Sequence, residues 1–188
     1  MITLDPTTKF GKGLHREVFV HPENENLCIK VVTYGNQQET KREQAYYRQL
    51  QKRNIAWDLL PKFHGNVETN LGPGAVFDVI RDPNGEISKT LEHYLADAEF
   101  VENNRQDIQA ALKNLKQYLL QYHIMSMAIK PKNVLYQLAE HGPGNLFIID
   151  NIGNSDFIPI CNYVYFLADQ KISRRWDRFI NKWQLNEQ

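Results

Sequence analysis

One lysine and one glutamate stand at positions where the surrounding sequence is apolar. Lys30 lies inside the predicted strand Leu27–Val32, whose other residues are hydrophobic. Glu43 lies on the apolar face of a predicted helix over Gln38–Arg53, one turn before Tyr47. A charged group in an apolar environment costs free energy unless it is paired. We therefore expect an ion pair between Lys30 and Glu43; a lysine that extends its ammonium group to water from an edge strand is the alternative.

Two closely spaced glycines near the N-terminus could bring backbone N–H groups close to a phosphate. Gly11 and Gly13 have no side chain that would block such an approach, although most glycine pairs of this kind mark ordinary turns. Arg16 follows three residues later, and its charge could face the same phosphate. The segment therefore predicts a strand–turn–strand unit with a candidate anion site at its tip.

Elements of two kinds must position these residues. Strands with one helix fill the first part of the chain, and helical periodicity takes over from about Arg105. We expect strands over 10–21, 27–32, 61–69 and 74–81, a helix over 38–53, a long helix from Arg105, a hairpin of 133–136 and 146–149, and a helical tail with the stripe Ile172, Trp176, Phe179, Ile180 and Trp183. This order predicts an α+β fold in one domain, residues 1–188, with an antiparallel-sheet lobe at about 8–81 and a reduced helical lobe at about 82–188. The turn Asp82–Gly85 is the expected hinge.

Four segments resemble, in the same order, the motifs of protein kinases. They are Gly11-x-Gly13 with Val18 for the glycine-rich loop, Leu27–Lys30 for the strand lysine, Ile129–Leu135 for the second part of the catalytic loop, and Asp150–Gly153 for the D-F-G motif. The resemblance implies a bilobal kinase-like fold in which Lys30 and Glu43 position the α- and β-phosphates of ATP. It also implies that Lys130 contacts the transferred phosphate and that Asn133 and Asp150 hold Mg²⁺.

The same resemblance implies a place for the adenine ring of ATP. The ring is expected between Val18 and Cys28 above and Leu135 below, with its edge near the backbone of Ile80–Asp82. Ile149 is expected nearby, and small or branched apolar side chains of this kind suit a flat ring.

The chain also departs from the kinase pattern. Arg16 replaces the third glycine of the first loop, and Ser126, Met127 and Ala128 replace the catalytic-loop His-Arg-Asp. Ala128 removes the group that accepts the proton of a substrate hydroxyl. No Ala-Pro-Glu motif follows Gly153, so a substrate is expected to be small or to dock differently from those of conventional protein kinases.

A closer resemblance covers the chain from about Thr8 to Phe179. The loop Lys130–Asn133 followed by Asp150–Gly153, with His15 and Arg16 in the first loop, is similar to the YrbL family of bacterial kinase-like proteins associated with the PhoP regulatory network. Further stretches that agree are Gly65–Thr69, Phe77–Ile80 and Trp176–Ile180. This resemblance implies a kinase-like fold and a regulatory link in a Gram-negative cytoplasm. It names no substrate, and the family also lacks the catalytic aspartate.

Composition excludes several other classes of function. Lys and Arg together number 22, as do Asp and Glu, so net charge gives no support for nucleic-acid or membrane-surface binding. The two cysteines form no C-x-x-C pair and the six histidines no H-x-x-x-H pair, which argues against disulfide and zinc sites. No signal peptide or membrane-span-length apolar run is visible, so the cytoplasm is the expected location. The tail cations are expected to face solvent, with an acidic partner or RNA as the alternative: Arg174, Arg175, Arg178 and Lys182.

Three functions remain open at this point. The favoured one is a kinase-like regulatory protein that binds ATP and Mg²⁺ and has little or no transfer activity, with a regulatory protein as a further partner. The second is an atypical kinase acting on a small molecule or a specific protein, because phosphoryl transfer depends chiefly on positioning and charge neutralisation. The third is an interaction module that binds no nucleotide, which Arg16 and Ala128 favour.

Overall fold

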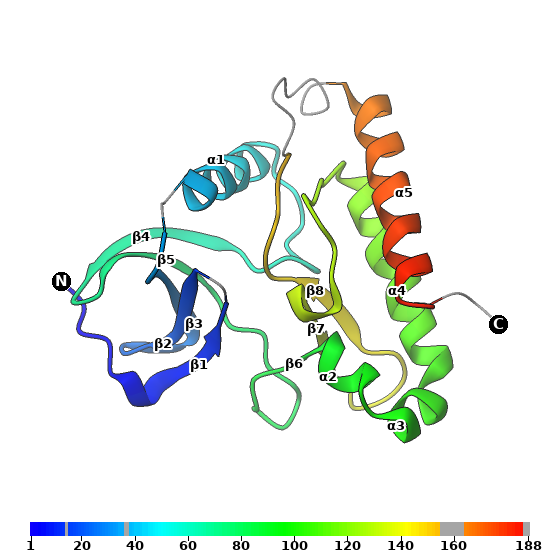
Figure 1. Ribbon diagram of the computed structural model, residues 1–188, viewed down its shortest axis with the longest axis horizontal. Helices are drawn as coiled ribbons and strands as arrows, with labels where there is room; N and C mark the ends of the chain where they lie inside the picture. The colour runs from blue at the N-terminus through cyan, green and yellow to red at the C-terminus, as the bar shows by residue number, and fades with distance from the viewer. Residues whose placement is uncertain (14, 36–37, 155–163, 186–188) are drawn as a thin grey trace. The chain divides into compact units, whose positions relative to one another are not determined.

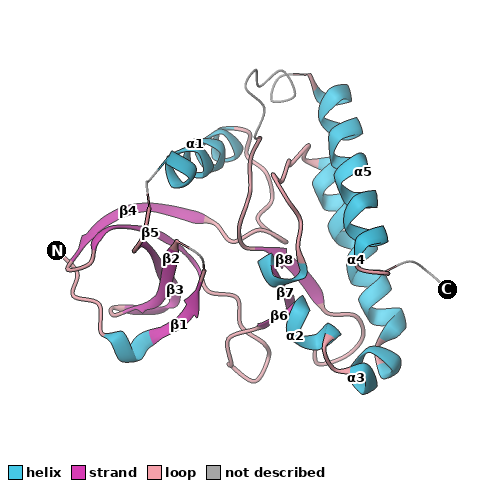
Figure 2. Ribbon diagram, viewed as in Figure 1, coloured by secondary structure: helices cyan, strands magenta, loops and turns pink. Residues whose placement is uncertain are grey.

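The chain forms two compact units in a computed structural model that describes residues 1–13, 15–35, 38–154 and 164–185. Unit 1 comprises Met1–Asn54 and Pro61–Ile80, and unit 2 comprises Ile55–Leu60 and Arg81–Gln188. Unit 1 is an antiparallel sheet with one long helix, whereas unit 2 is mainly helical with a small sheet (Figures 1 and 2). The expected α+β class is therefore confirmed.

The sheet of unit 1 is antiparallel and has five strands in the order β1-β2-β3-β5-β4. The strands are β1 (Lys9–Lys12), β2 (Arg16–His21), β3 (Asn24–Val32), β4 (Phe63–Thr69) and β5 (Gly72–Asp78), preceded by the 3-10 turn η1 (Pro6–Thr8). Strand β5 ends at Asp78 and not at Arg81 as expected. The next residue, Val79, donates its N–H to Asn26 O at 2.8 Å, outside the β5 ladder.

The two faces of this sheet differ in chemistry because side chains alternate along a strand. One face carries the hydrophobic core of Leu4, Phe19, Ile29, Val31 and Val76. The intervening residues of β2 and β3 point to the opposite face, and there Val18 pairs with Lys30 and Val20 with Cys28. Lys30 therefore lies in a strand whose neighbouring residues are core, as the sequence predicts.

Helix α1 (Gln38–Lys52) is held in unit 1 by aromatic and polar contacts. The ring of Tyr47 lies 5.2 Å from that of Phe77, centroid to centroid. The amides of Gln44 and Asn66 exchange two hydrogen bonds of 2.8 and 3.1 Å between the helix and β4. Gln51 adds a third bond, since its Nε2 donates to Phe63 O at 2.6 Å.

Unit 2 is built around two helices and a three-stranded sheet of order β6-β7-β8. Its elements are β6 (Lys89–Thr90), α2 (Leu91–Leu95), α3 (Ala98–Asn103), α4 (Arg105–Gln121), the 3-10 turn η2 (Pro131–Asn133), β7 (Val134–Gln137), β8 (Asn145–Ile148) and α5 (Tyr165–Lys182). The expected stripe of α4 is buried: Ile108, Leu112, Leu115 and Leu119. In α5, Ile172, Trp176 and Phe179 are buried, but Trp183 lies beyond the helix end and is 36% exposed.

The short elements β6, α2 and α3 were not expected from periodicity, because none is long enough to show one. Their start signals are capping residues: Thr90 Oγ1 accepts from His93 N at 3.2 Å, and Asp97 accepts from Phe100 N at 3.0 Å. The turn expected as a hinge is tied into unit 2, since buried Asp82 accepts from Ser88 Oγ at 2.6 Å and from Leu138 N at 2.9 Å. No helix within the described ranges is long and apolar enough to span a membrane.

The segment Ile55–Leu60 belongs to unit 2 although it separates two parts of unit 1. Tyr118 of α4 donates its hydroxyl proton to Ala56 O at 2.6 Å, and Ile148 N donates to Leu59 O at 3.4 Å. Burial raises the pKa of the Tyr118 phenol, which keeps this donor protonated. No local sequence signal marks the segment, because its partners lie far away in the chain.

We predict that Tyr118→Phe lowers the free energy of unfolding by about 1 kcal/mol, because it removes the donor to Ala56 O and leaves the ring in place. Urea denaturation followed by tryptophan fluorescence measures the change. Tyr34→Phe, at a residue that is 74% exposed, serves as the control and should change the unfolding midpoint little. Equal effects of the two variants would contradict the role of Tyr118.

Candidate functional site

The first loop of unit 1 is closed by backbone contacts. Gly13 N donates to Arg16 O at 2.7 Å, and Gly11 pairs with Val18 across β1 and β2. A Cβ at Gly11 would lie 3.1 Å from Val18 Cγ2, so glycine allows this close approach of the two strands. Leu14, at the tip, lies outside the described residues.

Lys30 lies between β2 and β5, opposite Val18 on one side and Ala75 on the other. Its Nζ is 4.5 Å from the centroid of the Phe77 ring, a cation–π contact within the usual distance. The strand thus holds Lys30 on the face of the sheet opposite Ile29 and Val31. The Lys30–Glu43 ion pair stays a prediction.

Arg16 forms a close ion pair with Glu43. Arg16 Nη1 lies 2.5 Å from Glu43 Oε2, and the Glu43 side chain is only 2% exposed. The pair joins the start of β2, just after the glycine turn, to the inward face of α1. An almost fully buried carboxylate needs such a partner, because desolvation disfavours its charge. The sequence predicted that Arg16 faces a phosphate and that Glu43 forms an ion pair with Lys30. The Arg16–Glu43 pair was therefore missed.

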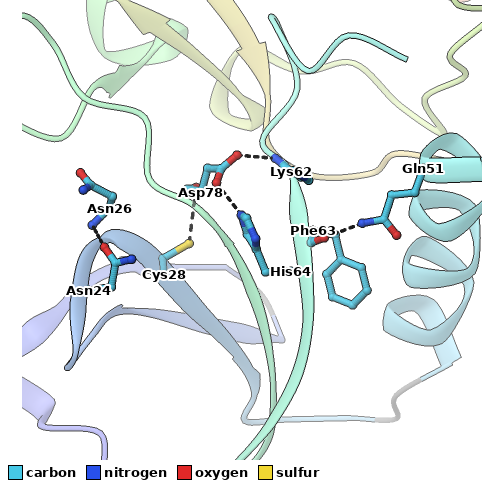
Figure 3. A network of polar contacts seen from close by, with 8 residues as sticks. All are labelled: Asn24, Asn26, Cys28, Gln51, Lys62, Phe63, His64 and Asp78. Atoms are coloured by element: carbon cyan, nitrogen blue, oxygen red, sulfur yellow. Dashed lines mark hydrogen bonds and ion pairs between the residues drawn. The ribbon is translucent and has the colours of Figure 1, made fainter. Parts of the chain in front are cut away.

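Cys28 sits beside a small polar network at the end of β5 (Figure 3). Its Sγ lies 3.8 Å from the backbone oxygen of Asp78, whose carboxylate accepts from Lys62 N at 2.8 Å and contacts His64 Nε2 at 2.6 Å. Burial raises the pKa of the Cys28 thiol to about 11, so the sulfur is neutral at physiological pH. A neutral, buried sulfur is chemically suited to an apolar ligand surface and unsuited to nucleophilic attack.

In unit 2 a ladder of backbone hydrogen bonds joins two segments that are distant in sequence. Gly153 N donates to Met125 O at 2.8 Å, Met127 N to Asn151 O at 2.6 Å, and Ile149 N to Asn133 O at 2.9 Å. Ser126 and Ile152 also form an antiparallel bridge. The ladder brings together the loop that carries Lys130 and Asn133 and the turn that carries Asp150.

The residues of unit 2 that the sequence predicts for the site lie in or next to the ladder and the two strands β7 and β8. Asn133 closes η2 by donating its N–H to Lys130 O at 2.8 Å, and the residue is buried. Lys130, at the cap of η2, is exposed. Asp150 follows β8 by two residues, and its Oδ1 accepts from Asn151 N at 2.9 Å. Leu135 on β7 and Ile149 just after β8 are both half-buried.

The donor set of unit 2 favours a shared metal ion over an all-protein metal site. The described part of the chain holds no group of three or more His, Cys, Asp or Glu side chains that could bind a metal ion. One amide oxygen from Asn133 and one carboxylate from Asp150 would leave most positions to phosphate oxygens and water. Mg²⁺ is usually bound in this way in nucleotide sites.

Five residues of unit 2 that support this arrangement were missed or misread in the sequence. Asn151 adopts the left-handed backbone conformation, φ 63°, and its carbonyl oxygen also accepts from buried Ser126 Oγ at 3.0 Å. Arg175 of α5 donates from Nη1 to Ser126 O, and Lys171 Nζ donates to Asn154 Oδ1 at 2.5 Å. The expectation that the tail cations face solvent is thus wrong for Arg175. A signal existed, since Lys171 and Arg175 flank the buried stripe at a spacing of four.

The sequence is similar to that of one protein family over nearly its whole length. The model of the family described as PhoP regulatory network protein YrbL matches residues 2–184. Two relatives, each named as an uncharacterized protein YrbL, come from Escherichia coli (strain K12) and Shigella flexneri. Each is 37% identical over 183 residues, which cover 96% of this chain and 87% of the relative.

The fold is similar to that of a chain from a kinase complex. A chain of the CAK complex from Chaetomium thermophilum, bound to ATP-γ-S, superposes with a TM-score of 0.54 at 20% sequence identity. The match covers 76% of this chain but 45% of the longer one. This likeness confirms the kinase-like fold.

We predict that Arg16→Gln destabilises unit 1 by about 2 kcal/mol, because it leaves the Glu43 carboxylate buried without its guanidinium. Glu43→Gln should cost less, and the double variant should show a coupling above about 1 kcal/mol in denaturant unfolding. Lys9→Gln is the matched control, since its pair with Glu17 is longer, at 3.2 Å, and more exposed. Additive effects of Arg16→Gln and Glu43→Gln would contradict the pairing.

We predict that Cys28 reacts slowly with iodoacetamide in a Cys161→Ser variant. Its pKa is raised from 9.0 to about 11, so at pH 8 the thiolate fraction is lower by about two orders of magnitude than in the unfolded chain. The neutral thiol favours the folded state below about pH 9, and this contribution is lost as the pH rises to about 11. Equal alkylation rates in native buffer and in urea, measured by mass spectrometry, would contradict it.

Proposed function

This chain belongs to the YrbL family of PhoP regulatory network proteins, and we propose that it acts there by binding ATP together with Mg²⁺ while transferring phosphate little or not at all. The kinase-like fold and the family membership support a kinase-like regulatory protein. The nucleotide, the metal ion and the weak catalysis are the proposed part. A regulatory protein partner that senses the bound state completes the proposal.

The observation that carries the proposal is the ladder in unit 2. It sets Asn133 and Asp150 on adjoining backbone segments, joined by the bond from Ile149 N to Asn133 O. An amide oxygen and a carboxylate on adjoining segments, with no cluster of three acidic, His or Cys ligands among the described residues, suit a metal ion that arrives with phosphates. Mg²⁺ bound there would neutralise phosphate charge, and these two side chains would orient it.

Unit 1 supplies the groups that would bind the rest of the nucleotide. Val18 and Cys28 lie on the same face of the sheet as Lys30 and offer an apolar surface for the base. Lys30 provides a cation for the phosphates, and the glycine turn provides backbone N–H groups. These assignments follow the kinase resemblance, residue by residue, and the fold supports them without a bound ligand.

Catalysis is expected to be weak because Ala128 offers no base. General-base assistance is typically worth about 10²–10⁴-fold in rate. Kinases turn over at roughly 1–100 s⁻¹, so the remaining groups could sustain only slow transfer. Slow transfer by an atypical kinase is therefore the alternative if a substrate is found.

A second candidate function rests on the Arg16–Glu43 pair. Because Arg16 already neutralises the buried Glu43, α1 is anchored without any ligand. This arrangement suits an interaction module whose kinase-like fold binds no nucleotide. Nucleotide titration separates the two candidates.

We predict that wild-type protein binds ATP and that Mg²⁺ strengthens binding by about tenfold or more. Asp150→Ala should remove this gain while leaving affinity in EDTA unchanged, because the carboxylate acts through the metal ion. Lys30→Ala should weaken binding about tenfold in both conditions, since its contact does not need the metal. Isothermal titration calorimetry measures all three affinities.

Asp177→Asn is the control, because this carboxylate is 62% exposed on α5 and should leave both affinities unchanged. Circular dichroism checks that each variant is folded. A wild-type protein that binds no ATP at millimolar concentration with Mg²⁺ would overturn the proposal and favour the interaction module. Slow hydrolysis that vanishes in Asp150→Ala would favour the atypical kinase.

A further inference from the structure

Helix α5 contacts one segment of the ladder directly, and the residue that follows the other segment, through polar side chains. Arg175 Nη1 donates to the backbone oxygen of Ser126, and Lys171 Nζ donates to Asn154 Oδ1 at 2.5 Å. Asp169, further towards the start of the helix, lies 2.6 Å from His123 Nδ1. The helix is thus bonded to residues on both sides of the ladder.

The burial of these contacts shows that they are built into unit 2. Lys171 is 5% exposed, Asn154 7% and Ser126 4%. A buried ammonium group is costly unless it is bonded, so its position is sharply defined by the groups around it. The two cations lie four residues apart on one face of the helix, where like charges repel each other. Each of them is bonded to a different segment of the chain.

Ser126 connects the helix contact to the ladder. Its backbone oxygen accepts from Arg175, while its hydroxyl donates to Asn151 O at 3.0 Å. Asn151 O also accepts from Met127 N at 2.6 Å, and Asn151 directly follows Asp150. A shift of Arg175 would therefore move Ser126 and the turn that carries Asp150.

We propose that Lys171 and Arg175 are positioning residues for the metal ion of the nucleotide site. Their hydrogen bonds hold the ladder in place and so set the relative positions of Asn133 and Asp150. Neither residue contacts the ligand itself. The role of these residues in metal binding rests on the proposed function above, whereas their effect on the stability of the ladder does not. Supporting groups around metal ligands typically matter about 10–100-fold in affinity.

The test compares Lys171→Met and Arg175→Gln with three control variants. Arg178→Gln removes an exposed cation from the same helix, and Ile172→Val removes one buried methyl group without changing charge. Arg175→Lys retains a donor near Ser126, so its exchange rates and its ATP affinity should stay close to those of the wild-type protein. Amide hydrogen exchange and the affinity for ATP in Mg²⁺ and in EDTA are measured for each variant.

We expect exchange at Met127 and Gly153 to accelerate about tenfold in Lys171→Met and Arg175→Gln, beyond any change in Ile172→Val. The gain in ATP affinity from Mg²⁺ should fall about tenfold in the same two variants, with affinity in EDTA unchanged. Exchange equal to that of Ile172→Val, or an unchanged Mg²⁺ gain, would overturn the proposal. If wild-type protein binds no ATP, the proposed function fails. The amide exchange rates alone then decide whether α5 stabilises the ladder.

Discussion

The backbone ladder between residues 125–133 and 149–153 is the constraint on which the proposed site depends. The loop and the turn contain little regular structure, and separate loops would not hold the two proposed metal ligands at a fixed distance. Three backbone hydrogen bonds make them one unit, and Asn151 O accepts a second hydrogen bond from Ser126 Oγ. The left-handed conformation of Asn151 turns its carbonyl towards Met127 and Ser126, a conformation that asparagine tolerates better than most residues.

Both units use a basic side chain to fix a short segment that belongs to the proposed site. In unit 1, Arg16 links the glycine turn to α1 through Glu43. In unit 2, Arg175 links α5 to the loop that lacks the catalytic aspartate. Each guanidinium has several fixed donors, so it can orient its partner as well as neutralise charge or satisfy a carbonyl. In both units a guanidinium therefore fixes the position of a segment that belongs to the site proposed above.

Sequence patterns predicted the long elements well. The stripe of α4 is periodic and the strand around Lys30 is a continuous apolar run, and both patterns can be recognised without knowing which surface they pack against. Lys130, Asn133 and Asp150 were assigned to the site because their motifs have fixed spacing, and their roles stay predictions. Short elements such as α2 escaped notice because one turn of helix carries no period.

Long-range pairings could not be read from the sequence. Arg16 was assigned to a phosphate and Arg175 to solvent, since local pattern does not tell which distant group a flexible side chain reaches. The packing of Ile55–Leu60 against α4 rests on Tyr118, which lies 62 residues from its acceptor. In each case a tertiary contact determines what the side chain does, and the local sequence contains no information about that contact.

The most direct test of the central claim is paramagnetic broadening of backbone amide resonances with Mn²⁺ and ATP bound to the wild-type protein. The account predicts that signals of Asn133, Asp150 and their ladder neighbours broaden first, and only when both Mn²⁺ and ATP are present. The same signals should stay sharp with ATP and Mg²⁺, which is diamagnetic. ATP binding that leaves the resonances of Asn133 and Asp150 sharp in the presence of Mn²⁺ would contradict the account.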